Sequence, residues 1–130
     1  MSNDTNNTNS SASSKYDIHE RIYKFIVNVI KLVNNLPRTS SNIVIINQIL
    51  RSSTSMGAND QEADGTNTRK DFLHKFTIVR KEAKETNFWL RLILNTNNSN
   101  LSKETEELIQ EGHELVAIVS TIINKTKEKH

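Results

Sequence analysis

The sequence predicts an all-α protein, an antiparallel up-down four-helix bundle that follows a disordered N-terminal tail. The 130 residues include only three Gly and one Pro, and so few helix breakers over such a length favour long helices. Apolar residues recur at alternating steps of four and three in four stretches, which is the spacing of helices packed in bundles. The first residues hold almost nothing that can be buried, so burial cannot offset the entropy of ordering them.

We expect a single domain, because a chain of this length has room for one small core. The disordered tail, rich in Asn, Ser and Thr, is expected to cover residues 1–15, and the bundle residues 16–127. The four helices are expected at about 17–36, 41–64, 69–95 and 102–126.

The first helix is expected to begin at Asp17 and to end before Pro37. The carboxylate of Asp17 can cap the first turn, and Glu20, three residues later, completes a capping box. Pro37 ends the helix because its ring cannot continue the hydrogen-bond ladder. The apolar row of this helix is Ile18, Ile22, Phe25, Val29, Leu32 and Leu36.

The second helix is expected to carry a polar stripe beside an apolar one. Thr39 or Ser41 can cap its start, and Gly57 in mid-helix indicates either the close approach of another helix or a local kink. The stripes are so close that part of the polar one is expected to be at least half-buried. The polar stripe is Gln48, Arg51, Ser55, Asn59 and Glu62, and the apolar one is Ile45, Ile46, Ile49, Leu50 and Met56.

The third and fourth helices complete the pattern. The third is expected to start after Thr68, and the fourth follows a turn at 96–100, with Ser102 as its cap. The apolar rows are Phe72, Phe76, Val79, Ala83, Thr86, Leu90 and Ile93 in the third helix and Leu101, Leu108, Gly112, Leu115, Val119 and Ile122 in the fourth.

Charged residues of the second and third helices are expected to meet in an inter-helix polar network. If the chain reverses near Gly65, Arg51 lies level with Glu82 and Glu85, and Glu62 lies level with Lys75 or Asp71. Buried ions are tolerated only when paired, so such a network would favour one register of the two helices. The alternative is that these side chains are solvated, at about 0 to 1 kcal/mol per pair. The expected network is Gln48, Arg51, Asn59, Glu62, Lys75, Glu82 and Glu85.

The third helix is also expected to present a basic face. Residues 68–95 carry a net charge of +4, from seven basic and three acidic residues, whereas residues 101–130 carry −2, from four and six. Phosphate groups of nucleic acid bind to faces of this kind, although most charged faces are only solvated. The candidate nucleic-acid-binding residues are Arg80, Lys84, Arg91, Lys81 and Lys70, and the apolar residues Leu73 and Phe88 among them are candidates for a subunit interface.

No motif of a catalytic, metal or cofactor site is recognised. The four histidines have no zinc-ligand spacing, and three scattered glycines cannot build a phosphate-binding loop. Without cysteine, neither disulfides nor thiolate metal sites can form. No apolar run reaches the roughly 20 residues of a membrane span, and no signal peptide is recognised. We therefore expect a cytoplasmic protein that is no enzyme, takes no cofactor, metal or small-molecule substrate, and contacts no membrane.

The motif from Gln48 to Ala63, QILRSSTSMGANDQEA, followed by Lys70-Asp71-Phe72, Lys81-Glu82-Ala83 and Trp89-Leu90, resembles the four-helix bundle proteins named after 23S ribosomal RNA intervening sequences. The resemblance covers about residues 16–123. It implies a small, soluble bundle that assembles as a ring, a pentamer, with no established enzymatic role. The accessory variability protein of diversity-generating retroelements, similar in architecture, pairs with a reverse transcriptase and nucleic acid.

Two classes of function remain open. The first is a homo-oligomeric interaction or scaffold protein, a pentameric ring whose surface recruits a protein or another macromolecule. The second is an accessory protein that binds RNA or DNA through the basic face of the third helix and partners a reverse transcriptase. Phosphate contacts release counterions, so the second class predicts an affinity that falls steeply with salt.

Overall fold

The computed structural model describes the backbone of residues 10–129 and, except for Ser99, the side chains of residues 18–129. Its helices are α2 (Ser10–Asn34), α3 (Ser40–Asp64), α4 (Arg69–Thr96) and α5 (Ser102–Glu128), with a 3-10 turn, η1 (Ser99–Leu101), before the last. None of these described residues forms a strand.

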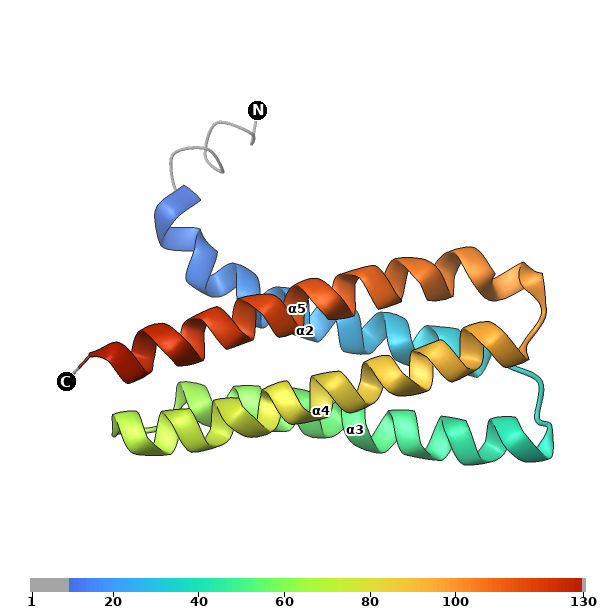
Figure 1. Ribbon diagram of the computed structural model, residues 1–130, viewed down its shortest axis with the longest axis horizontal. Coiled ribbons are helices and arrows are strands. Elements are labelled where there is room, and N and C mark those ends of the chain that lie inside the picture. Colours follow the sequence, from blue (N-terminus) through green and yellow to red (C-terminus); the bar gives the residue numbers. More distant parts are fainter. Residues whose placement is uncertain (1–9, 130) are drawn as a thin grey trace.

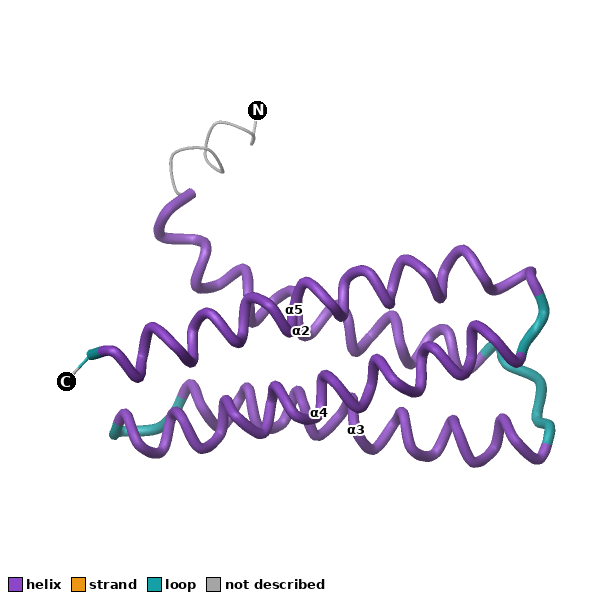
Figure 2. The backbone as a smooth tube through the Cα atoms, viewed as in Figure 1, coloured by secondary structure: helices purple, strands orange, loops and turns teal. Residues whose placement is uncertain are grey.

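The four helices alternate in direction and form two layers (Figure 1). α2 lies beside α5 in one layer, and α3 lies beside α4 in the other. Each helix packs on its two neighbours around the bundle: α2 and α4 both pack on α3 and on α5. Figure 2 shows that the connections are short and lie at the two ends of the bundle. The structure therefore confirms the predicted antiparallel up-down four-helix bundle.

The first helix is longer at its N-terminus than the sequence predicts. Its backbone is helical from Ser10, seven residues before the expected start, so Asp17 lies inside the helix and does not cap it. No Gly or Pro interrupts residues 10–17, so nothing there forces a helix to begin later. Of the tail expected at 1–15, residues 1–9 lie outside the described residues.

The caps of the other helices agree with the sequence in two cases of three. Thr39 caps α3, because its Oγ1 accepts a hydrogen bond from the Asn42 N–H at 3.2 Å, and Thr68 caps α4 by accepting from the Asp71 N–H at 3.1 Å. The cap predicted at Ser102 is wrong. The 3-10 turn leads directly into α5, so Ser102 is already helical, and Leu101 before it makes no side-chain cap bond.

The core lies along the bundle axis and is built from the four predicted rows. Val29, Ile49, Leu90 and Leu115 are fully buried, one from each helix. In α5 the pattern shifts by one position at its end, where Ile123 is buried and Ile122 is only partly so.

Gly57 marks a close approach between α2 and α3. A Cβ atom at this position would lie 2.6 Å from Cδ1 of Ile26, and α3 is helical on both sides of the glycine. Of the two alternatives that the sequence leaves open, the close approach is therefore the one observed.

A buried amide pair closes one end of the bundle. Asn42 of α3 is 2% exposed, and its Nδ2 donates to Oδ1 of Asn97 at 2.8 Å and to the carbonyl of Pro37 at 2.9 Å. Asn97 Nδ2 donates back to Asn42 Oδ1 at 3.1 Å. The two inter-helix connections at this end are thereby held together.

Candidate functional site

Arg51 of α3 joins two glutamates of α4. Its guanidinium lies 3.4 Å from Oε1 of Glu82 and also pairs with Glu85, while its Nε donates to Oε1 of Gln48 at 3.2 Å. The side chain of Glu82 is 9% exposed and that of Arg51 is 47% exposed. The pair therefore spans the boundary between the bundle interior and solvent, so the cation lies in a more strongly screened environment than the carboxylate.

Further hydrogen bonds hold these carboxylates in place. Glu82 Oε2 accepts from the Ser55 hydroxyl at 3.3 Å, and Asn59 Nδ2 donates to the Ser55 carbonyl at 2.9 Å. Trp89 Nε1 donates to Oε2 of Glu85 at 3.0 Å. This bond, followed by the one from Arg51, lowers the pKa of the Glu85 carboxyl, because each stabilises the charged form.

The remaining members of the expected network lie further along the same helix pair. Lys75 Nζ donates to Oε1 of Glu62 at 2.6 Å, so Lys75 and not Asp71 is its partner. At a level close to Arg51, the hydroxyls of Ser52 and Thr86 are 2.8 Å apart, and both residues are fully buried. The seven expected side chains therefore form two clusters on one side of α3 and α4, together with a buried hydroxyl pair.

Two side chains of α2 make polar contacts with other helices that were not predicted. Arg21 binds Glu111 of α5 with two hydrogen bonds, of 2.7 and 3.0 Å, and reaches Glu114 at 2.8 Å. His19 Nδ1 lies 2.8 Å from Oδ1 of Asp60 in α3.

Asp60 is a charged residue in the core row of α3. It is only 4% exposed, and burial raises the pKa of its carboxyl, opposed by the attraction and the hydrogen bond of His19. The sequence did contain a signal, because Asp60 stands between the core residues Met56 and Ala63 at steps of four and three.

The basic face of α4 borders a pocket against α5. The pocket has a volume of about 350 Å³ and is lined by Lys84, Asn87, Phe88, Arg91, His113 and Val116. Within the described part of the chain, neither Lys84 nor Arg91 forms an ion pair. Asn87 is 6% exposed, and its Oδ1 has no hydrogen-bond partner among the described residues.

The other candidates on α4 lie outside this pocket. Arg80 is half-buried one turn before Lys84, while Lys81 and Lys70 are exposed. Leu73 is half-buried and packs partly on the core. Phe88 is 48% exposed and makes an edge-on contact with Trp89, with ring centroids 4.9 Å apart.

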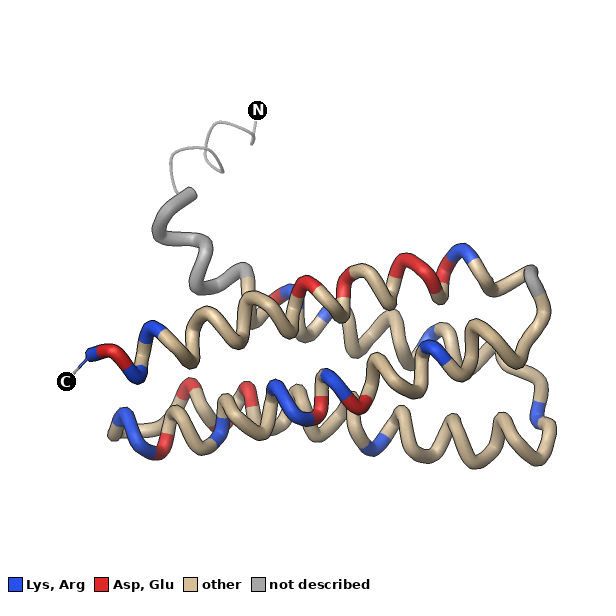
Figure 3. Tube along the Cα trace, viewed as in Figure 1, with Lys and Arg blue, Asp and Glu red and all other residues tan. Residues whose placement is uncertain are grey.

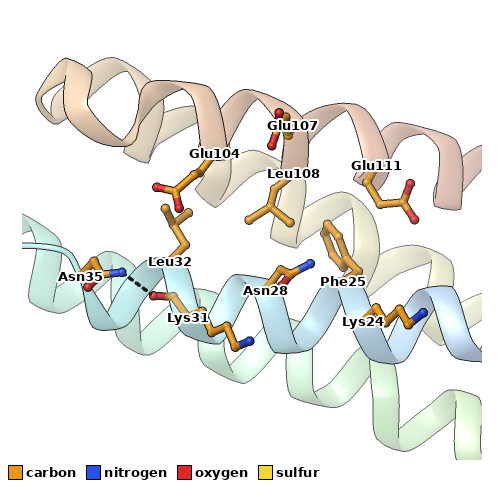
Figure 4. Close-up of a pocket in the computed structure, with 10 residues that line it drawn as sticks. All are labelled: Lys24, Phe25, Asn28, Lys31, Leu32, Asn35, Glu104, Glu107, Leu108 and Glu111. Carbon is orange, nitrogen blue, oxygen red and sulfur yellow. Dashed lines mark hydrogen bonds between the residues drawn. The ribbon is translucent and has the colours of Figure 1, made fainter.

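A second groove runs between α2 and α5. Figure 4 shows glutamates of α5 across from lysines of α2, above a floor of apolar side chains. Its volume is about 470 Å³, and its lining includes Lys24, Lys31, Glu104, Glu107 and Leu108. The groove therefore brings opposite charges of α2 and α5 together beside apolar side chains.

No group of three or more His, Cys, Asp or Glu that could hold a metal ion occurs among residues 18–129 with described side chains. Over the same part of the chain, no helix combines the length and the apolar character needed to cross a bilayer. Together with the fold, these surfaces define a small helical-bundle protein whose candidate sites are external faces.

The chain belongs to the 23S rRNA-intervening sequence protein family, whose model matches residues 14–121. It is also similar to a crystal structure of a protein of unknown function from the S23 ribosomal protein family of Bacteroides thetaiotaomicron. The two are 32% identical with a TM-score of 0.72, over 82% of this chain and 97% of that one. No curated protein matches the sequence. Both findings agree with the expected family and fold, and neither assigns an activity.

Proposed function

We propose that this protein is a non-enzymatic, cytoplasmic homo-oligomer that assembles as a ring and serves as an interaction scaffold. The family resemblance implies five copies in the ring. The observation that carries the proposal is an uncharged outer face at the start of α3, described next.

No charged residue occurs between Ser40 and Leu50. On the outer side of this stretch, Ile43 and Val44 are 46% and 59% exposed, and Leu50 is half-buried two turns further on. Depletion of charge around exposed apolar side chains is typical of the centre of a protein interface. We therefore favour this face over Leu73 and Phe88 as one side of the subunit contact.

The distribution of charge also suits a ring. Figure 3 shows basic residues spread along α4 and acidic residues gathered in the first half of α5. In a ring, each subunit contacts its neighbours through two different surfaces. With the uncharged α3 face as one of these surfaces, the basic face of α4 stays free for other contacts.

The test compares the mass of the particle in solution between wild type, a double variant of this face and a control variant. Ile43→Asn with Val44→Asn should dissociate the assembly while the helical content stays unchanged. Tyr23→Asn is the matched control, because Tyr23 is 65% exposed and lies on α2, not on this face of α3. Multi-angle light scattering at micromolar concentration gives both masses. A wild-type mass of one 14.8 kDa chain would reject the proposal.

A second candidate function is favoured by the basic face of α4. Lys84 and Arg91 flank one pocket, and repetition around a ring would multiply weak phosphate contacts by avidity. In this function the protein would bind RNA or DNA, with a reverse transcriptase as the partner that the retroelement relative implies. The combined Arg80→Ala, Lys84→Ala and Arg91→Ala variant should lose salt-dependent RNA binding. Equal binding by wild type and variant would remove this site.

A further inference from the structure

We infer that the pocket between α4 and α5 is a binding site for a single unpaired nucleotide, with the base against Phe88 and the flanking phosphates on Lys84 and Arg91. This inference rests on the second candidate function above. It goes beyond a basic face, because it assigns contacts to the base and therefore a preference for single strands.

The pocket combines three kinds of group. Lys84, Phe88 and Arg91 follow one another at steps of four and three on α4, so they lie on one face of the helix. The two cations are one turn to either side of the aromatic residue, and all three line the same pocket. Aromatic side chains in cationic grooves bind single strands by stacking on bases, whatever the sequence.

Asn87 supplies an independent indication of a ligand. Its Oδ1 is buried without a partner among the described residues, which is unfavourable in a fold that does not use the group. The residue lines the pocket beside Phe88. This oxygen is covered and lies against Gly112 of α5. A base against Phe88, whose edge carries N–H donors, therefore satisfies it only when the Asn87 amide turns toward the pocket.

The α5 wall of the pocket has space for the Asn87 side chain because residue 112 is a glycine. A Cβ atom at Gly112 of α5 would be 1.9 Å from Asn87 Oδ1, so any other residue at 112 would displace the amide. His113 and Val116 complete that wall. At about 350 Å³, the pocket falls at the lower end of the roughly 300–1,000 Å³ usual for small-molecule sites.

Paired bases cannot occupy such a site. A base in a duplex is stacked on both faces, so an aromatic side chain reaches only bases of single-stranded segments. Duplex of the same length offers more phosphates but no free base. The site therefore predicts tighter binding of single strands than the phosphate count alone would give.

The experiment compares a labelled 12-nucleotide oligo-dA with an abasic strand of the same length, by fluorescence anisotropy with the full chain. The abasic strand has the phosphates without the bases. We expect wild type to bind oligo-dA more tightly, and Phe88→Ala to remove that difference. The expected loss is at least about fivefold in Kd, which corresponds to about 1 kcal/mol. Tyr23→Ala, an exposed aromatic on α2, is the matched control and should bind like wild type.

The two cations have a separate readout. Lys84→Ala with Arg91→Ala should reduce the dependence of log Kd on log salt by about 0.7 for each phosphate that the protein no longer neutralises. The control removes the exposed cations Arg38 and Lys103, which lie outside the pocket. Competition by free dAMP distinguishes a pocket that takes mononucleotides from one that needs a strand. If dAMP displaces oligo-dA, the pocket binds the free nucleotide. If dAMP displaces nothing while Phe88→Ala still weakens binding, the pocket binds nucleotides only within a strand.

Three results would overturn the inference. If wild type binds both strands equally and Phe88→Ala changes neither affinity, the pocket binds no base, and only the proposed phosphate binding by the basic face of α4 remains. If no strand binds at low salt, both proposals fail. If Phe88→Ala instead dissociates the particle, Phe88 belongs to a subunit interface.

Discussion

Arg51 of α3 lies against Glu85 of α4 and reaches the more deeply buried Glu82 with the same guanidinium. One side chain therefore pairs with two carboxylates of the neighbouring helix. A shift of α3 along α4 by one turn would leave Glu82 without its cation, which is costly for a buried carboxylate. This arrangement is why we assign the cluster a role in the register of the two helices.

Replacement of Arg51 by Met should lower the melting temperature. Methionine keeps most of the apolar stem but removes the charge that stabilises Glu82 and Glu85. Arg38→Met removes an exposed cation in the connection between α2 and α3, and should melt like wild type. Thermal denaturation followed by circular dichroism measures both. An Arg51→Met protein that melts with wild type would show that the cluster has no structural role.

The buried hydroxyl pair predicts a double-mutant cycle. Thr86→Val or Ser52→Ala alone should cost about 0.5–1.5 kcal/mol, because the cross-helix bond is lost while the remaining hydroxyl can still donate to a carbonyl of its own helix. Removal of both should cost clearly less than the sum of the two single losses, since the cross-helix bond is lost only once. Urea denaturation supplies the free energies of unfolding. Strict additivity would contradict the hydrogen bond.

Asp60 predicts a specific dependence on pH. Because burial raises the pKa of its carboxyl, the native state holds the proton more tightly than the unfolded state, whose carboxyl titrates near about 3.9. As pH rises above that value and through the raised pKa, stability falls. Asp60→Asn cannot ionise and keeps an oxygen facing His19. Its advantage over wild type should therefore be larger at about pH 7 than at about pH 4.

Urea denaturation of wild type and Asp60→Asn at several pH values tests this expectation. Asp64→Asn is the control, because the side chain of Asp64 is 75% exposed and should show no such trend. A wild type that gains stability relative to Asp60→Asn as pH rises would mean that the attraction of His19 outweighs burial.

The two helical glycines predict different responses to alanine. Gly112→Ala should cost about 1–3 kcal/mol by overpacking, because its Cβ would lie 1.9 Å from the buried Asn87 Oδ1. Asn87→Ala in the same chain should restore much of that loss. Gly57→Ala meets only Cδ1 of Ile26, at 2.6 Å, and gains about 1 kcal/mol of helix propensity, so little net change is expected. Equal losses at both positions would contradict the close α4–α5 contact.

The sequence predicted the α3–α4 contacts better than those of α2. A short connection joins α3 to α4, so counting residues away from it along both helices shows which residues lie at the same height. This count placed Arg51 beside Glu82 and Glu85. No connection joins α2 to α5, so their relative height has to be counted through three connections, and each connection adds an error. The Arg21–Glu111 bond could therefore not be anticipated from spacing.

The candidate sites show the same limit. The position of Lys84 and Arg91 on one face follows from helical periodicity, but the pocket needs α5 as its second wall. Only the packed bundle shows that Gly112 lies against Asn87 and leaves that amide oxygen unpaired. The start of α2 was missed for a different reason, because a cap residue permits a helix to begin and does not force it to.

Self-assembly is the claim on which the proposed function depends, and native mass spectrometry of the wild-type protein at micromolar concentration tests it most directly. We predict one dominant particle of about five times the 14.8 kDa chain mass, stable over at least a tenfold dilution. A spectrum dominated by the single chain would contradict it.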